Sequence, residues 1–380
     1  MVAPEANLRA SERKKCLVPG SRNLKQLGLL AGVVILATGM LWGCSASEDT
    51  GRKSSSSVTS PSASEQEDGG RTGSRHPITA EEKSATQSTA SDAKSPGERL
   101  PASGPASEKI TGYKTSAEYF SIPSRNYSQG IVAVSLPLDY DKNPSKKYPL
   151  LIVFGGAGEC ARSPRQSALA WMHYYKADEA VLALQGNRLV SDNFRGLVKP
   201  HELNDFNRRL KRSPYEGIIL ACPSTPLVSA QAGPELPEME EYIMDELLPA
   251  LKKRYRVMEN RIGVDGVSMG GSRSMFYGLK YPEVFSSIGS VQGAFGPYLD
   301  IYRYLVKTNR QLLRKRSLQL ITSDRDVMLQ SVETMHKLLL EHHIPHSYLV
   351  LTGPHDYIFN QGPGAISLLV FHNQALRRSN

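Results

Sequence analysis

A serine between two glycines is the part of this sequence best suited to chemistry. Gly266, Ser268 and Gly270 form the pattern Gly-x-Ser-x-Gly. A serine at the tip of a sharp strand-to-helix turn has a strained backbone, so the flanking residues must lack side chains that would collide across the turn. This geometry lifts the serine hydroxyl above the end of a sheet and directs the first N–H groups of the following helix at the same place. The pattern therefore predicts a nucleophile beside an anion-stabilising site.

A serine hydroxyl is a good nucleophile only when a base removes its proton, and the base needs an acid to orient it. Downstream of Ser268 the sequence has suitable residues in the order acid, then histidine: Asp324 and Asp326, followed by His355. Each follows a predicted strand directly, so each is expected at the carboxyl edge of the sheet, where Ser268 also lies. We therefore expect Ser268, one of the two aspartates and His355 to form one site.

The elements that must position these residues alternate between strand and helix patterns. Runs rich in apolar and β-branched residues, bounded by Pro, Gly, Asp or Asn, predict strands at residues 119–122, 131–136, 148–154, 217–221, 261–267, 287–292, 317–322 and 347–351. Between them apolar residues recur at helical spacing, for example from Met239 to Tyr255, where Pro249 predicts a kink. This alternation indicates an α/β fold with a mostly parallel central sheet and helices on both faces.

Several longer motifs resemble one branch of the α/β hydrolases. They are residues 260–271, the segment 281–285 (Tyr-Pro-Glu-Val-Phe), the Gly-Pro-His-Asp-Tyr segment 353–357, and Tyr-Pro-Leu at 148–150 leading into the Gly-Gly loop at 155–156. Together they are similar to the esterase D-like family, which includes feruloyl esterases, S-formylglutathione hydrolases, enterochelin esterases and mycolyltransferases. The resemblance covers residues 116–376 and implies the α/β-hydrolase fold.

The resemblance also implies roles for individual residues. Ser268 would be the nucleophile, His355 the base and an aspartate the orienting acid. Asp326 fits the Gly-x-x-Asp pattern of the family better, with Ser323 at the glycine position, and Asp324 is the alternative acid. The implied activity is hydrolysis of carboxylic esters through an acyl-enzyme, with no cofactor and no metal.

Two backbone N–H groups, those of Gly156 and Met269, would form the oxyanion hole on the same resemblance. Phe154 stands where the family often has His, which affects the expected shape of the loop more than its donor. Two alternative functions share the fold. An acyltransferase would use the same acyl-enzyme and pass the acyl group to an alcohol, and a binding lipoprotein would perform no turnover.

The N-terminal part of the chain looks like an export signal. Basic residues precede an apolar run, residues 27–42, that ends in Leu-Trp-Gly-Cys at 41–44. This ending resembles a bacterial lipobox, although Trp42 is bulkier than the small residue usual there. We expect lipidation at Cys44, and the alternative is a retained membrane anchor, because the run is only slightly short of a spanning helix. Either interpretation puts the chain after Cys44 outside the cytoplasm, in the cell envelope.

Composition divides the rest of the chain in two. Residues 44–109 are rich in Ser, Gly, Pro and charged residues and predict a disordered tether, and residues 110–380 predict the catalytic domain, with residues 1–43 as signal peptide or anchor. The formal net charge is +9. No nucleic-acid-binding motif accompanies the basic residues, so we expect an ester substrate and the membrane as partners and no nucleic acid.

Two of the four cysteines, Cys160 and Cys222, fall in the predicted domain. They follow predicted strands that would be neighbours in an α/β-hydrolase sheet. An oxidising compartment would permit a disulfide between them, and two buried thiols are the alternative. Three histidines, His342, His343 and His346, lie close together, but no carboxylate or cysteine with ligand spacing accompanies them, so we predict no metal site.

Overall fold

The computed structural model describes residues 107–186, 188–228 and 233–377, which all belong to one compact unit, Ala93–Asn380. The predicted signal peptide or anchor, Cys44 and most of the predicted tether lie outside the described residues. Within the described ranges, no helix is long and apolar enough to cross a membrane.

One sheet organises the described residues. Its nine strands have the order β1-β2-β3-β5-β4-β6-β7-β8-β9. The first three strands and β5 pair antiparallel, and β5, β4, β6, β7, β8 and β9 pair parallel. The strands are β1 (Glu108–Ile110), β2 (Ser116–Ser121), β3 (Ile131–Leu136), β4 (Tyr148–Phe154), β5 (Ile219–Pro223), β6 (Val257–Gly266), β7 (Ser287–Val291), β8 (Ser317–Arg325) and β9 (Ser347–Pro354).

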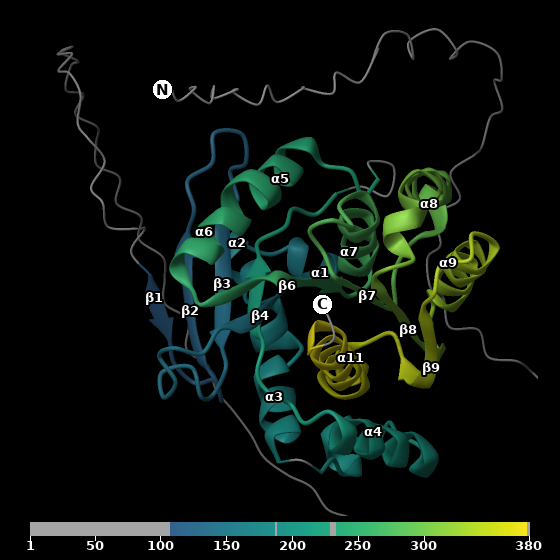
Figure 1. Ribbon diagram of the computed structural model, residues 1–380, viewed down its shortest axis with the longest axis horizontal. Coiled ribbons are helices and arrows are strands. Elements are labelled where there is room, and N and C mark those ends of the chain that lie inside the picture. The colour runs from purple at the N-terminus through teal and green to yellow at the C-terminus, as the bar shows by residue number, and fades with distance from the viewer. Residues whose placement is uncertain (1–106, 187, 229–232, 378–380) are drawn as a thin grey trace, which may run out of the picture. The chain divides into compact units, whose positions relative to one another are not determined.

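Helices cover both faces of this sheet. In Figure 1, α5, α6, α7 and α8 lie above the sheet, and α3, α4 and α11 lie below it. The helices are α1 (Ala157–Cys160), α2 (Pro164–Ala168), α3 (Ala177–Gln185), α4 (Pro200–Arg212), α5 (Pro237–Glu241), α6 (Leu248–Arg254), α7 (Met269–Lys280), α8 (Leu299–Leu313), α9 (Leu329–Glu341), α10 (Tyr357–Phe359) and α11 (Ala365–Arg377). Short π-helical and 3-10 turns complete them: η1 (Ala170–Tyr174), η2 (Ser191–Phe194), η3 (Tyr242–Leu247), η4 (Gly296–Tyr298) and η5 (Asn360–Gly364).

The central strand β4 explains why both faces need helices. Leu150 and Ile152 point into the core beneath α6, α7 and α8, while Leu151 and Val153 point into the core shared with α3 and α11. All four side chains are fully buried. Because successive side chains of a strand point to opposite faces, a continuously apolar strand must be covered on both sides.

This architecture confirms the predicted α/β-hydrolase fold. Each predicted strand corresponds to an observed strand, with ends shifted by a few residues. One observed strand, β1, is not predicted by the sequence. It lies at the predicted end of the tether and is too short and polar to give a sequence pattern. Around Pro249 the chain stays helical: the proline is the second residue of α6, which directly follows the π-helical turn η3.

Cys160 and Cys222 are buried free thiols rather than a disulfide. The sulfur of Cys160 lies 2.8 Å from Thr225 Oγ1, and that of Cys222 lies 3.8 Å from the carbonyl oxygen of Ser167. The strand before Cys160, β4, pairs with β5, which contains Cys222, as expected. Burial raises the pKa of both thiols, that of Cys222 to about 12.

A buried aspartate–histidine pair supports the strand that leads to Ser268. His372 of α11 places Nε2 2.9 Å from Asp265 Oδ2 and Nδ1 2.7 Å from Ser287 Oγ. Both side chains are completely buried. Burial raises the pKa of Asp265, and the contact with His372 opposes that rise. Asp265 also accepts a hydrogen bond from the N–H of Gly266, so this pair fixes the base of the serine turn.

We therefore predict that His372→Leu lowers the free energy of unfolding by about 3–5 kcal/mol, because it leaves the Asp265 carboxyl buried without its partner. Urea denaturation of the variant and the wild type measures this difference. The control is His201→Leu, a change of the same type at an exposed position of α4. Equal destabilisation by both substitutions would contradict a supporting role for the buried pair.

Candidate functional site

The parallel strands end at one edge of the sheet, and the predicted site residues lie there, after five of these strands. Each of these strands is followed by a segment that faces the same region. The segments are the glycine loop after β4 (Gly155, Gly156), the serine turn after β6 (Ser268), and the residues after β7 (Gln292), β8 (Asp326) and β9 (His355).

Ser268 has the strained backbone predicted from its motif. Its φ of 56° and ψ of −116° lie in a region that residues other than glycine rarely adopt. A Cβ atom at Gly266 would come within 2.3 Å of the Gly270 carbonyl oxygen, and one at Gly270 within 2.5 Å of the Phe154 carbonyl oxygen. Both glycines are therefore required by close backbone contacts on either side of Ser268.

The structure brings Asp326 and His355 together. His355 Nδ1 lies 2.6 Å from Asp326 Oδ1. The aspartate side chain is fully buried, and the histidine side chain is 19% exposed. Thr322 Oγ1 donates to the other carboxylate oxygen at 2.6 Å, and the N–H of Met328 donates to Oδ1 at 2.8 Å. The carboxylate is thus held in one orientation by three contacts.

Asp324, the alternative acid, lies elsewhere. Its Oδ1 accepts a hydrogen bond from the N–H of Gly353 at 3.0 Å, and its side chain is 43% exposed. Among the described contacts, none joins it to His355. Asp324 therefore ties the end of β8 to the end of β9 instead of orienting the histidine.

Gln292, which no sequence motif marks as a site residue, connects the ends of β8 and β9. Its side-chain Nε2 donates to Ser323 Oγ at 2.8 Å and to the carbonyl of Pro354, the residue before His355, at 3.0 Å. Its backbone has a φ of 50° and its side chain is fully buried. A glutamine at a strand end carries no recognisable sequence signal for such a contact.

Two pockets meet at Ser268. The first, the apolar pocket, has a volume of about 350 Å³ and is lined by Leu227, Pro234, Met269, Tyr298 and Met328, among others. The second, the histidine pocket, has a volume of about 390 Å³. It contains His355 and the glycine loop. A further hollow of about 510 Å³, lined by Lys252, Glu259 and Lys315, contains none of the predicted site residues.

The predicted oxyanion donors differ in their availability. Met269 is the first residue of α7, so its N–H has no partner within the helix. The N–H of Gly156, by contrast, donates to the Tyr175 hydroxyl at 3.0 Å. The next residue, Ala157, lines both pockets together with Ser268, and no described hydrogen bond involves its N–H. The N–H group that this loop leaves available beside Ser268 is therefore that of Ala157, whereas the sequence suggests that of Gly156.

A buried carboxylate holds this loop against the histidine loop. Glu159 is only 2% exposed, and it accepts hydrogen bonds from the hydroxyls of Tyr175 and Tyr357. Burial, followed by the effect of Glu159, raises the pKa of both tyrosines, so both remain protonated and donate. Tyr357 lies two residues after His355, and Tyr175 contacts Gly156. One carboxylate thus connects the two loops that border the histidine pocket.

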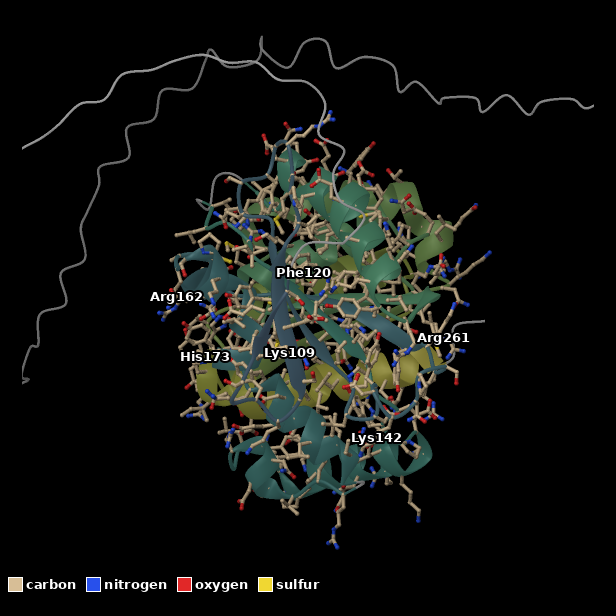
Figure 2. All side chains as sticks on the ribbon, turned by 90° about the vertical axis from the view of Figure 1, so that its left-hand side faces the viewer. Lys109, Phe120, Lys142, Arg162, His173 and Arg261 are labelled. Carbon is tan, nitrogen blue, oxygen red and sulfur yellow. The ribbon has the colours of Figure 1, made fainter. Side chains whose placement is uncertain are left out.

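Further aromatic side chains pack next to Tyr357, a lining residue of the histidine pocket. The rings of Tyr174 and Tyr357 stack with centroids 6.0 Å apart, and the Arg162 guanidinium lies 4.8 Å from the centre of the Tyr174 ring. The His173 ring packs edge-on against Tyr174 at 4.7 Å. Figure 2 shows Arg162 and His173 on the same flank of the molecule. Two other aromatic residues, Trp171 and Tyr302, are buried in the core.

A family model matches the central part of the chain. The Esterase family, described as "Putative esterase", matches residues 223–336, a segment that contains Ser268 and Asp326 but not His355. No curated protein matches the sequence.

Solved structures give the second comparison. A ferulic acid esterase is 16% identical, with a TM-score of 0.51 over 70% of this chain and 100% of its own. An S-formylglutathione hydrolase from Agrobacterium tumefaciens is 16% identical, with a TM-score of 0.48 over 71% of this chain and 98% of its own. A fluorophosphonate-binding serine hydrolase from Staphylococcus aureus is 13% identical, with a TM-score of 0.46 over 70% of this chain and 99% of its own.

At these identities the structural likeness concerns the fold, which the first of these structures shares. The enzyme class rests on the family model that matches residues 223–336, the segment around Ser268. Taken together, the sheet, the serine turn and the matched segment identify the chain as a carboxylic ester hydrolase of the α/β-hydrolase fold, similar to the Esterase family.

Proposed function

We propose that this esterase cleaves its substrates through an acyl-enzyme formed on Ser268, with His355 as base and Asp326 as the orienting acid. The observation that carries the proposal is the 2.6 Å contact between His355 Nδ1 and Asp326 Oδ1 in a site that also contains the strained Ser268. An ordinary structural histidine pair would not need a serine in a high-energy backbone conformation beside it.

The contact with Asp326 selects the tautomer of the His355 imidazole. An ionised carboxylate only accepts hydrogen bonds, so Nδ1 of His355 carries the proton that it shares with Asp326. Nε2 then has a free lone pair and takes the proton of the Ser268 hydroxyl as the oxygen attacks the ester carbonyl. The tetrahedral intermediate collapses when His355 returns this proton to the leaving alcohol. Water repeats the sequence on the acyl-enzyme and releases the acid.

Two backbone N–H groups would stabilise the negative charge of the intermediate. We assign them to Met269 and Ala157, since the N–H of Gly156 is engaged by the Tyr175 hydroxyl. Each such donor contributes about 2.7–4 kcal/mol to catalysis in other serine hydrolases. Glu159 and Tyr175 would act indirectly, by holding the loop that carries Ala157.

The two pockets would receive different halves of the ester. The group that protonates the leaving alcohol must lie beside it, and His355 lines the histidine pocket. The alcohol part therefore belongs in this pocket, next to Tyr357 and Tyr175. The acyl part then extends to the other side of Ser268, into the apolar pocket.

The nucleophile assignment predicts that wild-type protein cleaves p-nitrophenyl esters of short acids and forms a covalent adduct with a fluorophosphonate. Ser268→Ala should lower kcat by about 10⁶-fold and abolish the adduct. Ser145→Ala is the control, because it removes a hydroxyl from an exposed loop position. Absence of an adduct on wild-type protein, or an adduct on a residue other than Ser268, would reject the assignment.

The choice of acid predicts unequal effects for two similar substitutions. Asp326→Asn should lower kcat by about 10⁴-fold, because an amide stabilises the wrong tautomer of His355. Asp324→Asn should change kcat by only a few fold, since the amide oxygen can still accept from the N–H of Gly353. Steady-state kinetics on one ester measures both. Near-normal rates for Asp326→Asn would show that the histidine is oriented by another group.

We also propose that the enzyme acts outside the cytoplasm, attached to a membrane through Cys44. The support is the sequence of residues 1–44, with basic residues, an apolar run and a lipobox-like ending.

Mass spectrometry of the protein purified from membranes tests this location. The expected product begins at Cys44 and carries a diacylglyceryl group on its sulfur, and Cys44→Ala should prevent this processing. Recovery of protein that retains residues 1–43 would favour the uncleaved anchor and exclude lipidation.

A further inference from the structure

Arg273 forms part of the wall of the apolar pocket beside the proposed nucleophile. It lies on α7, where residues 269, 272 and 273 face the pocket that also contains Ser268. Arginine is strongly hydrated and almost never fully buried unless a partner compensates its charge. Arg273 is nevertheless only 1% exposed.

The contacts of this guanidinium leave its charge uncompensated. Nη2 donates to the carbonyl of Pro226 at 2.7 Å, and Nη1 lies 3.8 Å from the sulfur of Cys160. Nε is buried and has no hydrogen-bond partner within the described ranges. No carboxylate of the described residues forms an ion pair with Arg273. A buried cation with a free donor beside a pocket indicates that a ligand group completes its partners.

The groups that surround Arg273 do not supply a negative charge. Burial raises the pKa of the Tyr127, Tyr277 and Tyr302 hydroxyls and of the Cys160 thiol, and Arg273 opposes this rise only in part. All four therefore remain neutral near pH 7. Glu159, the residue before Cys160, directs its carboxylate to Tyr175 and Tyr357 in the other pocket.

We propose that Arg273 binds a carboxylate at the far end of the substrate's acyl group. The preferred substrates are then half-esters of short dicarboxylic acids. This inference rests on the proposed function, because it takes Ser268 as the point from which the acyl group extends. It assigns a specificity-determining role to a residue that the sequence motifs leave without one.

The helix geometry sets the length of this acyl group. Arg273 is five positions after Ser268, so their backbones are about 7.5 Å apart along the axis of α7. Side chains on a helix lean towards its N-terminus, which brings the guanidinium nearer to Ser268. A chain of about four to five carbons, such as a succinyl or glutaryl group, spans such a distance. Longer unbranched apolar chains would instead meet the guanidinium without a hydrogen-bond acceptor.

Binding to the Ser268→Ala protein tests the proposal without turnover. Monoethyl succinate and ethyl butyrate have acyl chains of the same length, with a carboxylate in one where the other has a methyl group. Isothermal titration should give a dissociation constant for monoethyl succinate about 10- to 100-fold lower than that for ethyl butyrate. Equal affinity, or weaker binding of the half-ester, would overturn the proposal with Arg273 intact.

Substitution of Arg273 identifies the cation responsible. In the Ser268→Ala background, Arg273→Met should remove the preference for monoethyl succinate, and Arg273→Lys should retain part of it because the charge remains. Arg303→Met is the control, since it makes the same change in net charge on α8 and leaves the apolar pocket unaltered. Thermal unfolding checks that Arg273→Met is folded. A preference that survives in folded Arg273→Met would overturn the assignment.

Turnover by the protein with Ser268 intact separates this inference from the proposed function. Adduct formation with a fluorophosphonate together with equal kcat/KM for the two esters would reject the role of Arg273 and leave the nucleophile in place. Tighter binding of the half-ester to Ser268→Ala, combined with no adduct on wild-type protein, would support the carboxylate site and reject the acyl-enzyme. The expected result is a higher kcat/KM for monoethyl succinate that falls selectively in Arg273→Met.

Discussion

The strained backbone of Ser268 is the constraint on which the rest of the site depends. A non-glycine residue in this conformation costs about 1–3 kcal/mol, so the surroundings must hold it. Its N–H donates to the carbonyl of Val291 on β7, and its carbonyl accepts from the N–H groups of Ser272 and Ala294. The turn is therefore pinned by α7, by β7 and by the loop after β7 at once. Loss of these hydrogen bonds would let the backbone of Ser268 relax and would move its hydroxyl away from the site.

The same sheet edge explains how residues far apart in sequence meet. Parallel strands bring their carboxyl ends together, so the loops after β8 and β9 face the serine turn. Gln292 joins these loops, and Glu159 joins the histidine loop to the glycine loop through two tyrosines. Beneath the turn, Asp265 and His372 fix the end of β6. The proposed catalytic groups thus rest on buried polar contacts from both layers of helices.

Much of the fold and part of the site could be predicted from the sequence. The alternation of apolar strands with amphipathic helices gave the architecture, because burial on both faces of a parallel sheet leaves a continuous apolar pattern, as in β4. Ser268, Asp326 and His355 were recognisable because each belongs to a motif at a strand end. The sequence favours Asp326 but keeps Asp324 as an alternative. Their different contacts appear only in the structure, where Asp324 accepts a hydrogen bond from the N–H of Gly353.

Other features of the site have no local signature. The engagement of Gly156 by Tyr175 depends on how the segment between β4 and β5 folds back over the glycine loop. The missing hydrogen-bond partner of Arg273 Nε, among the described residues, is likewise a property of its surroundings, since an arginine one turn after a serine motif looks like an ordinary surface residue in sequence. Such contacts depend on side chains from distant elements, which periodicity and spacing do not specify.

The central claim is that Ser268 Oγ attacks the ester carbonyl. The negative charge then develops on the carbonyl oxygen, between the N–H groups of Met269 and Ala157. A crystal structure of the protein after reaction with a fluorophosphonate tests this most directly, because the adduct mimics the tetrahedral intermediate. Our account predicts phosphorus bonded to Ser268 Oγ and the phosphoryl oxygen within about 3.1 Å of the N–H groups of Met269 and Ala157. A phosphoryl oxygen directed away from both N–H groups, or phosphorus on another residue, would contradict it.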